Sequence, residues 1–162
     1  MSDLLYQEEV RSWKTSLLFL ILTLVFFSFF LWRVSVVGYL AFPIVCLCMT
    51  LVFLFYVFNY RTLQIMITEE DLQLRFGVVG WKTDLANITQ ARLDDSPWWI
   101  KYGGAGVHFA FVNRIYRAYY NFLEFPRLII TFHQKQGLVQ ALVFTTRNPD
   151  QILEILQTSV EK

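Results

Sequence analysis

Two long apolar runs near the N-terminus constrain this chain more than any other feature of its sequence. They cover Ser16 to Trp32 and Val36 to Phe58, and Arg33 is the one charge between them. A bilayer core about 30 Å thick is crossed by roughly 20 apolar helical residues, so uncharged runs of this length predict spanning helices. The sequence therefore predicts a membrane anchor over residues 1–61, with spans at 16–32 and 36–58, and a separate domain over 62–162.

Basic residues around the two runs predict the orientation of the anchor. Arg11 and Lys14 precede the first run and Arg61 follows the second, while only Arg33 lies in the turn. Cytoplasmic flanks retain Lys and Arg, and acidic residues contribute little to orientation. We therefore expect an integral membrane protein with both termini in the cytoplasm. The first ten residues are weakly amphipathic and are expected near the membrane surface.

Composition excludes several classes of function. The chain is 56% hydrophobic, which is ordinary once two helices are assigned to lipid. A formal net charge of +1 supplies no field that would attract nucleic acid, so nucleic acid is not an expected partner. No Asp, Glu, Lys or His interrupts either run, which favours an anchor over a channel or transporter. Cys46 and Cys48 would lie on different faces of one helix and cannot pair with each other.

After Arg61 the apolar residues alternate with polar ones, as they do in strands with one buried face. The first two strands are expected around 63–67 and 72–76, with the acidic turn Glu69-Glu70-Asp71 between them. Further strands are expected at 81–84, 88–93, 107–111, 115–121, 128–133 and 138–145. Turns are expected at 77–80 and 134–137, because both segments end in a glycine.

The last segment changes period again and predicts a helix. Asn148 can cap it, Pro149 suits its first position, and Ile152, Ile155 and Leu156 form one apolar stripe. Such a helix can cover an open end of a small sheet. The expected fold class is an α+β membrane protein, with a two-helix transmembrane hairpin followed by a small antiparallel β-barrel that is capped by a C-terminal α-helix.

Three short segments carry a resemblance to a known group of proteins. They are Ile67 to Leu72, Gly103 to Val107 and Thr145 to Pro149, in this order behind two apolar runs. In this arrangement the chain resembles the bacterial membrane proteins that carry a pleckstrin-homology-like (PH-like) domain after a two-helix hairpin. The resemblance covers nearly the whole chain. It implies a PH-like barrel, the bacterial inner membrane as location, and binding in place of catalysis.

Candidate binding residues lie in two regions. The stretch 94–104 is the longest without strand alternation, and it contains Trp98 and Trp99 beside Lys101, a combination suited to a protein partner or the membrane interface. The alternative is that both rings pack over the rim of the barrel. Arg114 and Arg117 lie among tyrosines, which suits an anionic headgroup or a polar peptide. A solvated strand face is the alternative for this pair.

Motifs for catalysis and metal binding are missing from the sequence. There is no Gly-x-Ser-x-Gly elbow, no HExxH pair and no Cys/His dyad, and neither His108 nor His133 has a partner at a metal-ligand spacing. No cofactor, metal or enzymatic activity is expected. The acidic turn at Glu69-Glu70-Asp71 would repel an anionic headgroup at the position where phosphoinositide-binding PH domains carry a basic loop.

The expected function is a membrane-anchored interaction module. It would bind a protein partner, either as an accessory subunit of a membrane complex or as a homo-oligomer, through Trp98, Trp99, Lys101, Arg114 and Arg117. The alternative is a sensor of the membrane surface that binds anionic lipid.

Overall fold

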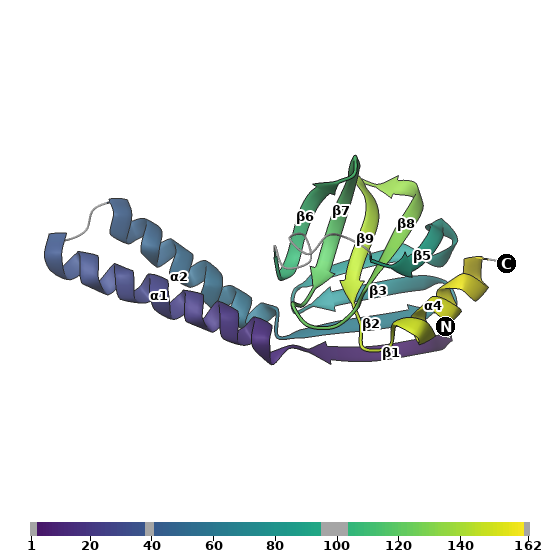
Figure 1. Cartoon of the computed structure of the whole chain (residues 1–162), viewed down its shortest axis with the longest axis horizontal. Helices are drawn as coiled ribbons and strands as arrows, with labels where there is room; N and C mark the ends of the chain where they lie inside the picture. The colour runs from purple at the N-terminus through teal and green to yellow at the C-terminus, as the bar shows by residue number, and fades with distance from the viewer. Residues whose placement is uncertain (1–2, 38–40, 95–103, 161–162) are drawn as a thin grey trace.

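The computed structural model describes residues 3–37, 41–94 and 104–160. Strand β1 (Leu4–Arg11) leads into helix α1 (Trp13–Val37), and helix α2 (Ala41–Asn59) leads into strand β2 (Thr62–Thr68). Figure 1 shows the two helices side by side as a long hairpin that projects from one end of a β-rich domain. The other elements are β3 (Asp71–Phe76), β4 (Val79–Asp84), the 3-10 turn η1 (Leu85–Asn87), β5 (Ile88–Leu93), β6 (Gly106–Val112), β7 (Ile115–Asn121), β8 (Arg127–Gln136), β9 (Val139–Thr145) and α4 (Pro149–Val160).

Helices α1 and α2 are long and apolar enough to cross a membrane. At 1.5 Å per residue they measure about 37 Å and 28 Å. Only 11% of the apolar stretch of α1 and 17% of that of α2 is buried, so they are not core helices of the domain. They pack on each other through rings such as Phe26 and Phe53, whose centroids lie 5.4 Å apart. Near the hairpin tip the Arg33 guanidinium lies over the rings of Trp32 and Phe42.

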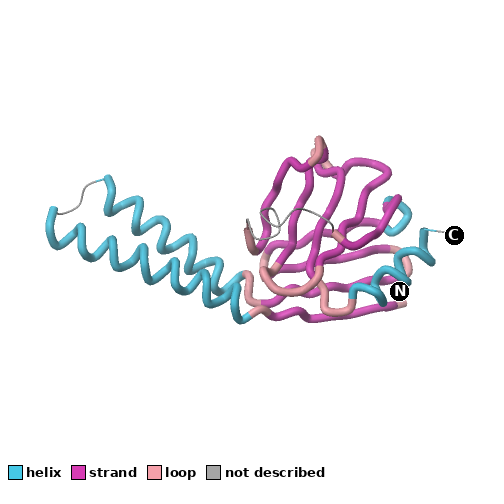
Figure 2. The backbone as a smooth tube through the Cα atoms, in the orientation of Figure 1, coloured by secondary structure: helices cyan, strands magenta, loops and turns pink. Residues whose placement is uncertain are grey.

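The strands form two sheets (Figure 2). The first has the order β1-β2-β3-β4 and is antiparallel throughout, and the second has the order β5-β8-β9-β7-β6. The expectation of a small antiparallel barrel was wrong in two respects. The sheets do not close on each other, and β7 pairs with β9 in parallel. The β6–β7 hairpin pairs through β7 with β9, which leaves β5 and β6 as the edges of the second sheet among the described strands.

One core lies between the two sheets. The alternating residues of β2 and β3 are at most 1% exposed, and they are Leu63, Ile65, Ile67, Leu72, Leu74 and Phe76. They share a cluster with residues of β7, β8 and β9 and with Ile152 and Leu156 of α4. The alternation predicted for the first hairpin, the strands at 88–93 and 115–121, and the start of the last helix at Pro149 are confirmed.

Strand β1 differs from what the sequence predicted for the first ten residues. Residues 4–11 form a strand that pairs with β2, with Glu8 opposite Ile65 and Arg11 opposite Thr62, where the sequence predicted only a weakly amphipathic segment. Tyr6, Glu8 and Val10 alternate on the buried side of the strand. The first sheet therefore combines segments from both sides of the helical hairpin, and the two helices continue the β1–β2 pair.

Short connections and direct contacts join the hairpin to the sheets. Ser12 alone separates β1 from α1, and its Oγ accepts a hydrogen bond from the Thr15 amide at 3.0 Å, which caps the helix. The Thr15 hydroxyl in turn accepts a bond from the amide of Leu123 at 3.4 Å. At the end of α2, Asn59 Oδ1 accepts a bond from the Val78 amide in the β3–β4 turn at 2.9 Å.

Tyr60 is the centre of this joint. It directly follows α2 and is 6% exposed. Its ring lies 6.2 Å from that of Phe19 in α1 and 5.3 Å from that of Phe76 in the domain core. Gly106, at the start of β6, has a φ of +85°, and a Cβ there would meet the Tyr60 ring at 2.4 Å. The first residue of β6 thus packs flat on Tyr60.

Replacing Gly106 by alanine tests this joint. Gly137 also has a positive φ, +62°, but a Cβ there would meet nothing within 4 Å. Gly137→Ala should cost only the backbone strain of about 1–2 kcal/mol. Gly106→Ala should cost clearly more, because the methyl group also displaces Tyr60. Thermal unfolding of the purified full chain, followed by circular dichroism, would compare the two, and equal losses would contradict the tight contact.

Candidate functional site

The β2–β3 turn forms an acidic tip at the end of the first sheet that lies away from the helices. The Thr68 hydroxyl accepts hydrogen bonds from the amides of Glu70 and Asp71, at 3.2 Å and 3.0 Å, which closes the turn. The Lys82 ammonium, 2.8 Å from the Asp71 carboxylate, lowers the pKa of Asp71 below its usual range. Glu69 and Glu70 stay exposed. This end of the domain therefore presents two carboxylates to solvent.

Helix α4 is fixed beside β1 by a buried carboxylate. Glu8 accepts hydrogen bonds from the Thr146 hydroxyl at 2.5 Å, the Arg147 amide at 2.9 Å and the Tyr6 hydroxyl at 3.0 Å. The Asn148 side chain donates to the Tyr6 hydroxyl at 3.2 Å. The first backbone amides of a helix have no acceptor within the helix. A carboxylate close to them is therefore stabilising. Glu8 therefore sets where α4 begins relative to β1.

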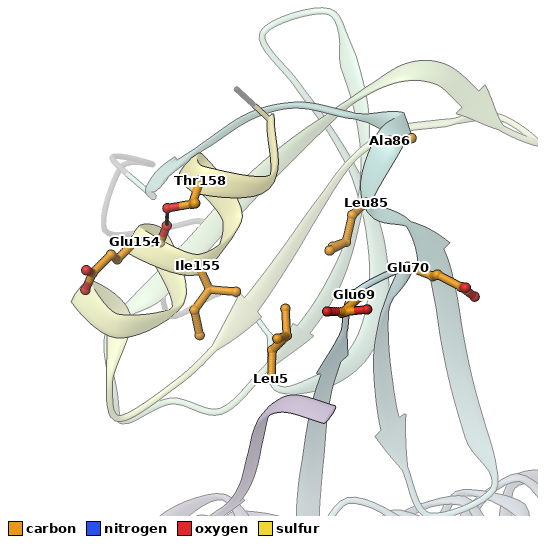
Figure 3. A pocket seen from close by; sticks show the side chains of 8 residues that line it. All are labelled: Leu5, Glu69, Glu70, Leu85, Ala86, Glu154, Ile155 and Thr158. Atoms are coloured by element: carbon orange, nitrogen blue, oxygen red, sulfur yellow. Dashed lines mark hydrogen bonds between the residues drawn. The ribbon is translucent and has the colours of Figure 1, made fainter. Parts of the chain in front are cut away.

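A groove of about 820 Å³ lies between α4, the end of β1, the β2–β3 turn and η1. In Figure 3 the side chains of Leu5, Leu85 and Ile155 converge on a common space, while Glu70 and Glu154 lie at opposite rims. The remaining lining residues are Glu69, Ala86 and Thr158. Leu5 is 45% exposed, which is high for a leucine that points into a depression. The groove thus combines an apolar floor with acidic rims.

No protein-family model matches the sequence, and the comparisons with curated proteins and with solved structures found no match. Among residues 3–37, 41–94 and 104–160, no group of three His, Cys, Asp or Glu side chains could hold a metal ion. Within the described residues, the groove is the candidate functional site.

The residues predicted to bind a partner are distributed differently from what the sequence suggested. Trp98, Trp99 and Lys101 lie outside the described residues. Arg114 is exposed in the two-residue turn of the β6–β7 hairpin. Arg117 is 3% exposed, so its guanidinium is buried, and it lies on the face of the second sheet that is directed away from the first sheet. The two arginines are not brought together in one site.

Arg117 belongs to a buried ion cluster with Asp94 and Arg127. The Asp94 carboxylate lies 3.3 Å from Arg127 and 3.8 Å from Arg117, and the three side chains are at most 4% exposed. The Asp94 amide also donates to the Arg127 carbonyl at 2.8 Å. Removing one member of a buried ion pair leaves an uncompensated charge, which is strongly destabilising. The cluster therefore ties the end of β5 to β7 and β8.

His108 lies on β6 close to this cluster. Its ring stacks on that of Tyr119 with centroids 4.8 Å apart and an angle of 4° between the planes. Burial lowers the pKa of His108, and the nearby charge of Arg127 lowers it further. Nδ1 of His108 is buried and makes no hydrogen bond with the described residues. The imidazole is therefore held in its neutral form at pH 7.

The groove was missed in the sequence because its walls come from distant segments. Leu5, the Glu69-Glu70 turn and Ile155 meet only after β1 has paired with β2 and α4 has docked. A local signal was present in the acidic turn and in Ile155, which the sequence placed on the buried stripe of the helix. In the structure Ile155 is only partly buried, whereas Ile152 and Leu156 are fully buried.

Removing the Glu8 carboxylate should loosen α4. Glu8→Ala leaves a buried hydroxyl and the Arg147 amide without their acceptor, so a loss of about 2–3 kcal/mol is expected. Glu9 is the matched control on the same strand, because its pair with Arg11 is at the surface and should be worth less than about 1 kcal/mol. Thermal unfolding of the full chain would measure both, and similar losses for the two variants would contradict the proposed role of Glu8.

The state of His108 predicts a pH dependence of stability. Because the folded protein lowers the pKa of His108, the unfolded chain binds the proton more readily, and stability should fall as the pH drops below about 6.5. For one proton the slope is at most about 1.4 kcal/mol per pH unit. His108→Phe keeps the ring stack and should flatten the fall between pH 7 and pH 5. His133→Phe, at an exposed position, is the control, and an equal flattening there would contradict the assignment.

Proposed function

We propose that this chain is a membrane-anchored docking module, in which α1 and α2 cross the bilayer and the groove beside α4 binds a protein segment with apolar and basic side chains. The groove carries the proposal, because it combines an apolar floor and acidic rims at the end of the domain farthest from the helices. A partner could reach it from the solvent without approaching the bilayer.

The exposure of the two helices supports the membrane part of the proposal. Their surfaces carry leucine, valine and phenylalanine side chains that are between 36% and 75% exposed, including Leu24, Phe29, Leu51 and Phe58. At about 25 cal/mol per Å² of apolar surface, leaving two such helices in water would be very unfavourable. Soluble monomers rarely expose so large an apolar patch, whereas a bilayer covers it. The location in a bacterial inner membrane with cytoplasmic termini belongs to the same proposal.

The order of the elements supports a PH-like assignment of the domain, which is also part of the proposal. Antiparallel hairpins are followed by more strands and by one C-terminal helix that packs at the end of the sheets. The domain departs from a PH barrel in its parallel β7–β9 pair and in the strand β1, which precedes the helices. A resemblance of this kind suggests binding, but it does not by itself indicate a ligand.

Charge and shape determine the partner that would fit. Glu69, Glu70 and Glu154 favour lysine and arginine side chains at the rims, and the exposed faces of Leu5 and Ile155 favour an apolar anchor between them. An amphipathic helix or an extended segment with basic flanks has this combination. The acidic rims equally disfavour an anionic lipid headgroup at this end of the domain.

Photo-crosslinking in cells would test the docking role. A photoreactive amino acid at Leu5 of the full chain should give an adduct with one protein, through a segment rich in apolar and basic residues. The double variant Glu70→Lys with Glu154→Lys should weaken binding at least tenfold, since each reversal changes the interaction by on the order of 1 kcal/mol. The adduct should therefore be lost.

Glu9→Lys is the control for this experiment, because it reverses a surface charge on β1 outside the groove. It should leave the adduct intact. Adducts that survive the groove variant, a crosslinked segment that is acidic, or adducts only between copies of this chain would contradict the proposed partner chemistry.

A further inference from the structure

Five exposed apolar side chains lie on elements that meet at the opposite end of the domain, near the base of the helices. They are far more exposed than core side chains of the same type, with fractions of 77%, 75%, 70%, 69% and 52% for Val78, Phe58, Phe111, Trp13 and Phe109. We call these five residues the collar. They come from the ends of both helices, from the β3–β4 turn and from strand β6.

Contacts between the domain and the end of α2 hold the collar residues of the β3–β4 turn and of β6 close to the base of the helices. The Val78 amide donates to Asn59, the last residue of α2, and Gly106 at the start of β6 packs on the ring of Tyr60. In Figure 1, β6 is the strand of its sheet drawn nearest to the helices, and it runs across their direction. Strand β6, which carries Phe109 and Phe111, therefore begins against the base of the hairpin and does not lie at the far end of the domain.

Basic and acidic side chains are also found at opposite ends of the first sheet. Lys14, Arg61 and Arg75 lie at the end that carries the helices, where Arg61 and Arg75 line a shallow groove with Phe58. The acidic Glu69-Glu70 turn lies at the other end. Exposed aromatic rings mixed with cationic side chains suit the interface of an anionic bilayer, where rings enter the acyl boundary and cations meet phosphates.

From these observations we infer that the collar inserts into the interfacial region of an anionic bilayer, with Val78, Phe109 and Phe111 beside the helices and with Lys14, Arg61 and Arg75 against lipid phosphates. This inference rests on the membrane part of the proposed function. The lipid surface is the occupant because the helices hold the collar at the level where they would enter the bilayer. The domain then lies against the membrane with its acidic groove turned away.

Depth-dependent fluorescence quenching would test the inference on the full chain. Cys46 and Cys48 are replaced by alanine, and single cysteines are introduced by Val78→Cys or Phe111→Cys, labelled with an environment-sensitive dye and reconstituted into nanodiscs that contain phosphatidylglycerol. Leu138→Cys is the matched control, since Leu138 is 78% exposed in the β8–β9 turn, and β7 separates β9 from β6. Leu51→Cys, 57% exposed on α2, reports on the helices.

Spin-labelled lipids should quench the dye at positions 51, 78 and 111 and leave position 138 unaffected, while a water-soluble quencher should act mainly at 138. If position 51 is quenched by lipid but 78 and 111 respond like 138, the inference fails and the spanning helices stand. If position 51 is not quenched by lipid, the membrane proposal itself fails. Protection of position 111 from both quenchers would show a protein surface on the collar and would also overturn the inference.

Discussion

The structure depends on the continuity between its β1–β2 pair and its helical hairpin. One residue separates β1 from α1 and two separate α2 from β2, so the two helices and the two strands form one antiparallel pair with a change of secondary structure in its middle. Tyr60 and the Ser12 cap fill the junction, and the Asn59 side chain binds the neighbouring turn. A linker this short leaves little freedom, so the direction of the helices also sets the direction of the sheets.

Most strands of the fold could be predicted from the sequence. Strand β1 could not. Strands β2 and β3 bury nearly every second residue, and this period is local, whereas β7 and β9 are buried along most of their length. Strand β1 pairs with residues more than 50 positions away, and its buried face includes Glu8, a charge that hides the alternation of Tyr6 and Val10. The carboxylate can be buried because two donors come from the residues before α4 and a third from Tyr6 on β1 itself, which no local pattern reveals.

The placement of the candidate binding residues likewise depends on contacts between distant segments, which a local sequence pattern does not predict. Arg117 was predicted to contact a partner, with a solvated strand face as the alternative, and both interpretations expect an exposed side chain because a charged residue within a strand usually faces water. Its position opposite Asp94 depends on the order β5-β8-β9-β7, and strand order is not encoded in the hydrophobic period. Arg114 lies in a two-residue turn between β6 and β7, which was not predicted from the sequence. The barrel expectation failed for the same reason as Arg117, since closure depends on which strands become neighbours.

The two proposed surfaces lie at opposite ends of the same strands, and this has a physical consequence. Strand β2 has seven residues, which at 3.3 Å per residue span about 23 Å. If the collar lies in the interface, the acidic groove is held roughly that far from the headgroups and cannot fold back onto them, because β2 is hydrogen-bonded on both sides. A partner would then meet the groove at a fixed height and orientation, whereas a flexible linker would spread the same site over many positions. The short connections on both sides of the helices would thus serve the docking role directly, by limiting a binding partner to one layer above the membrane.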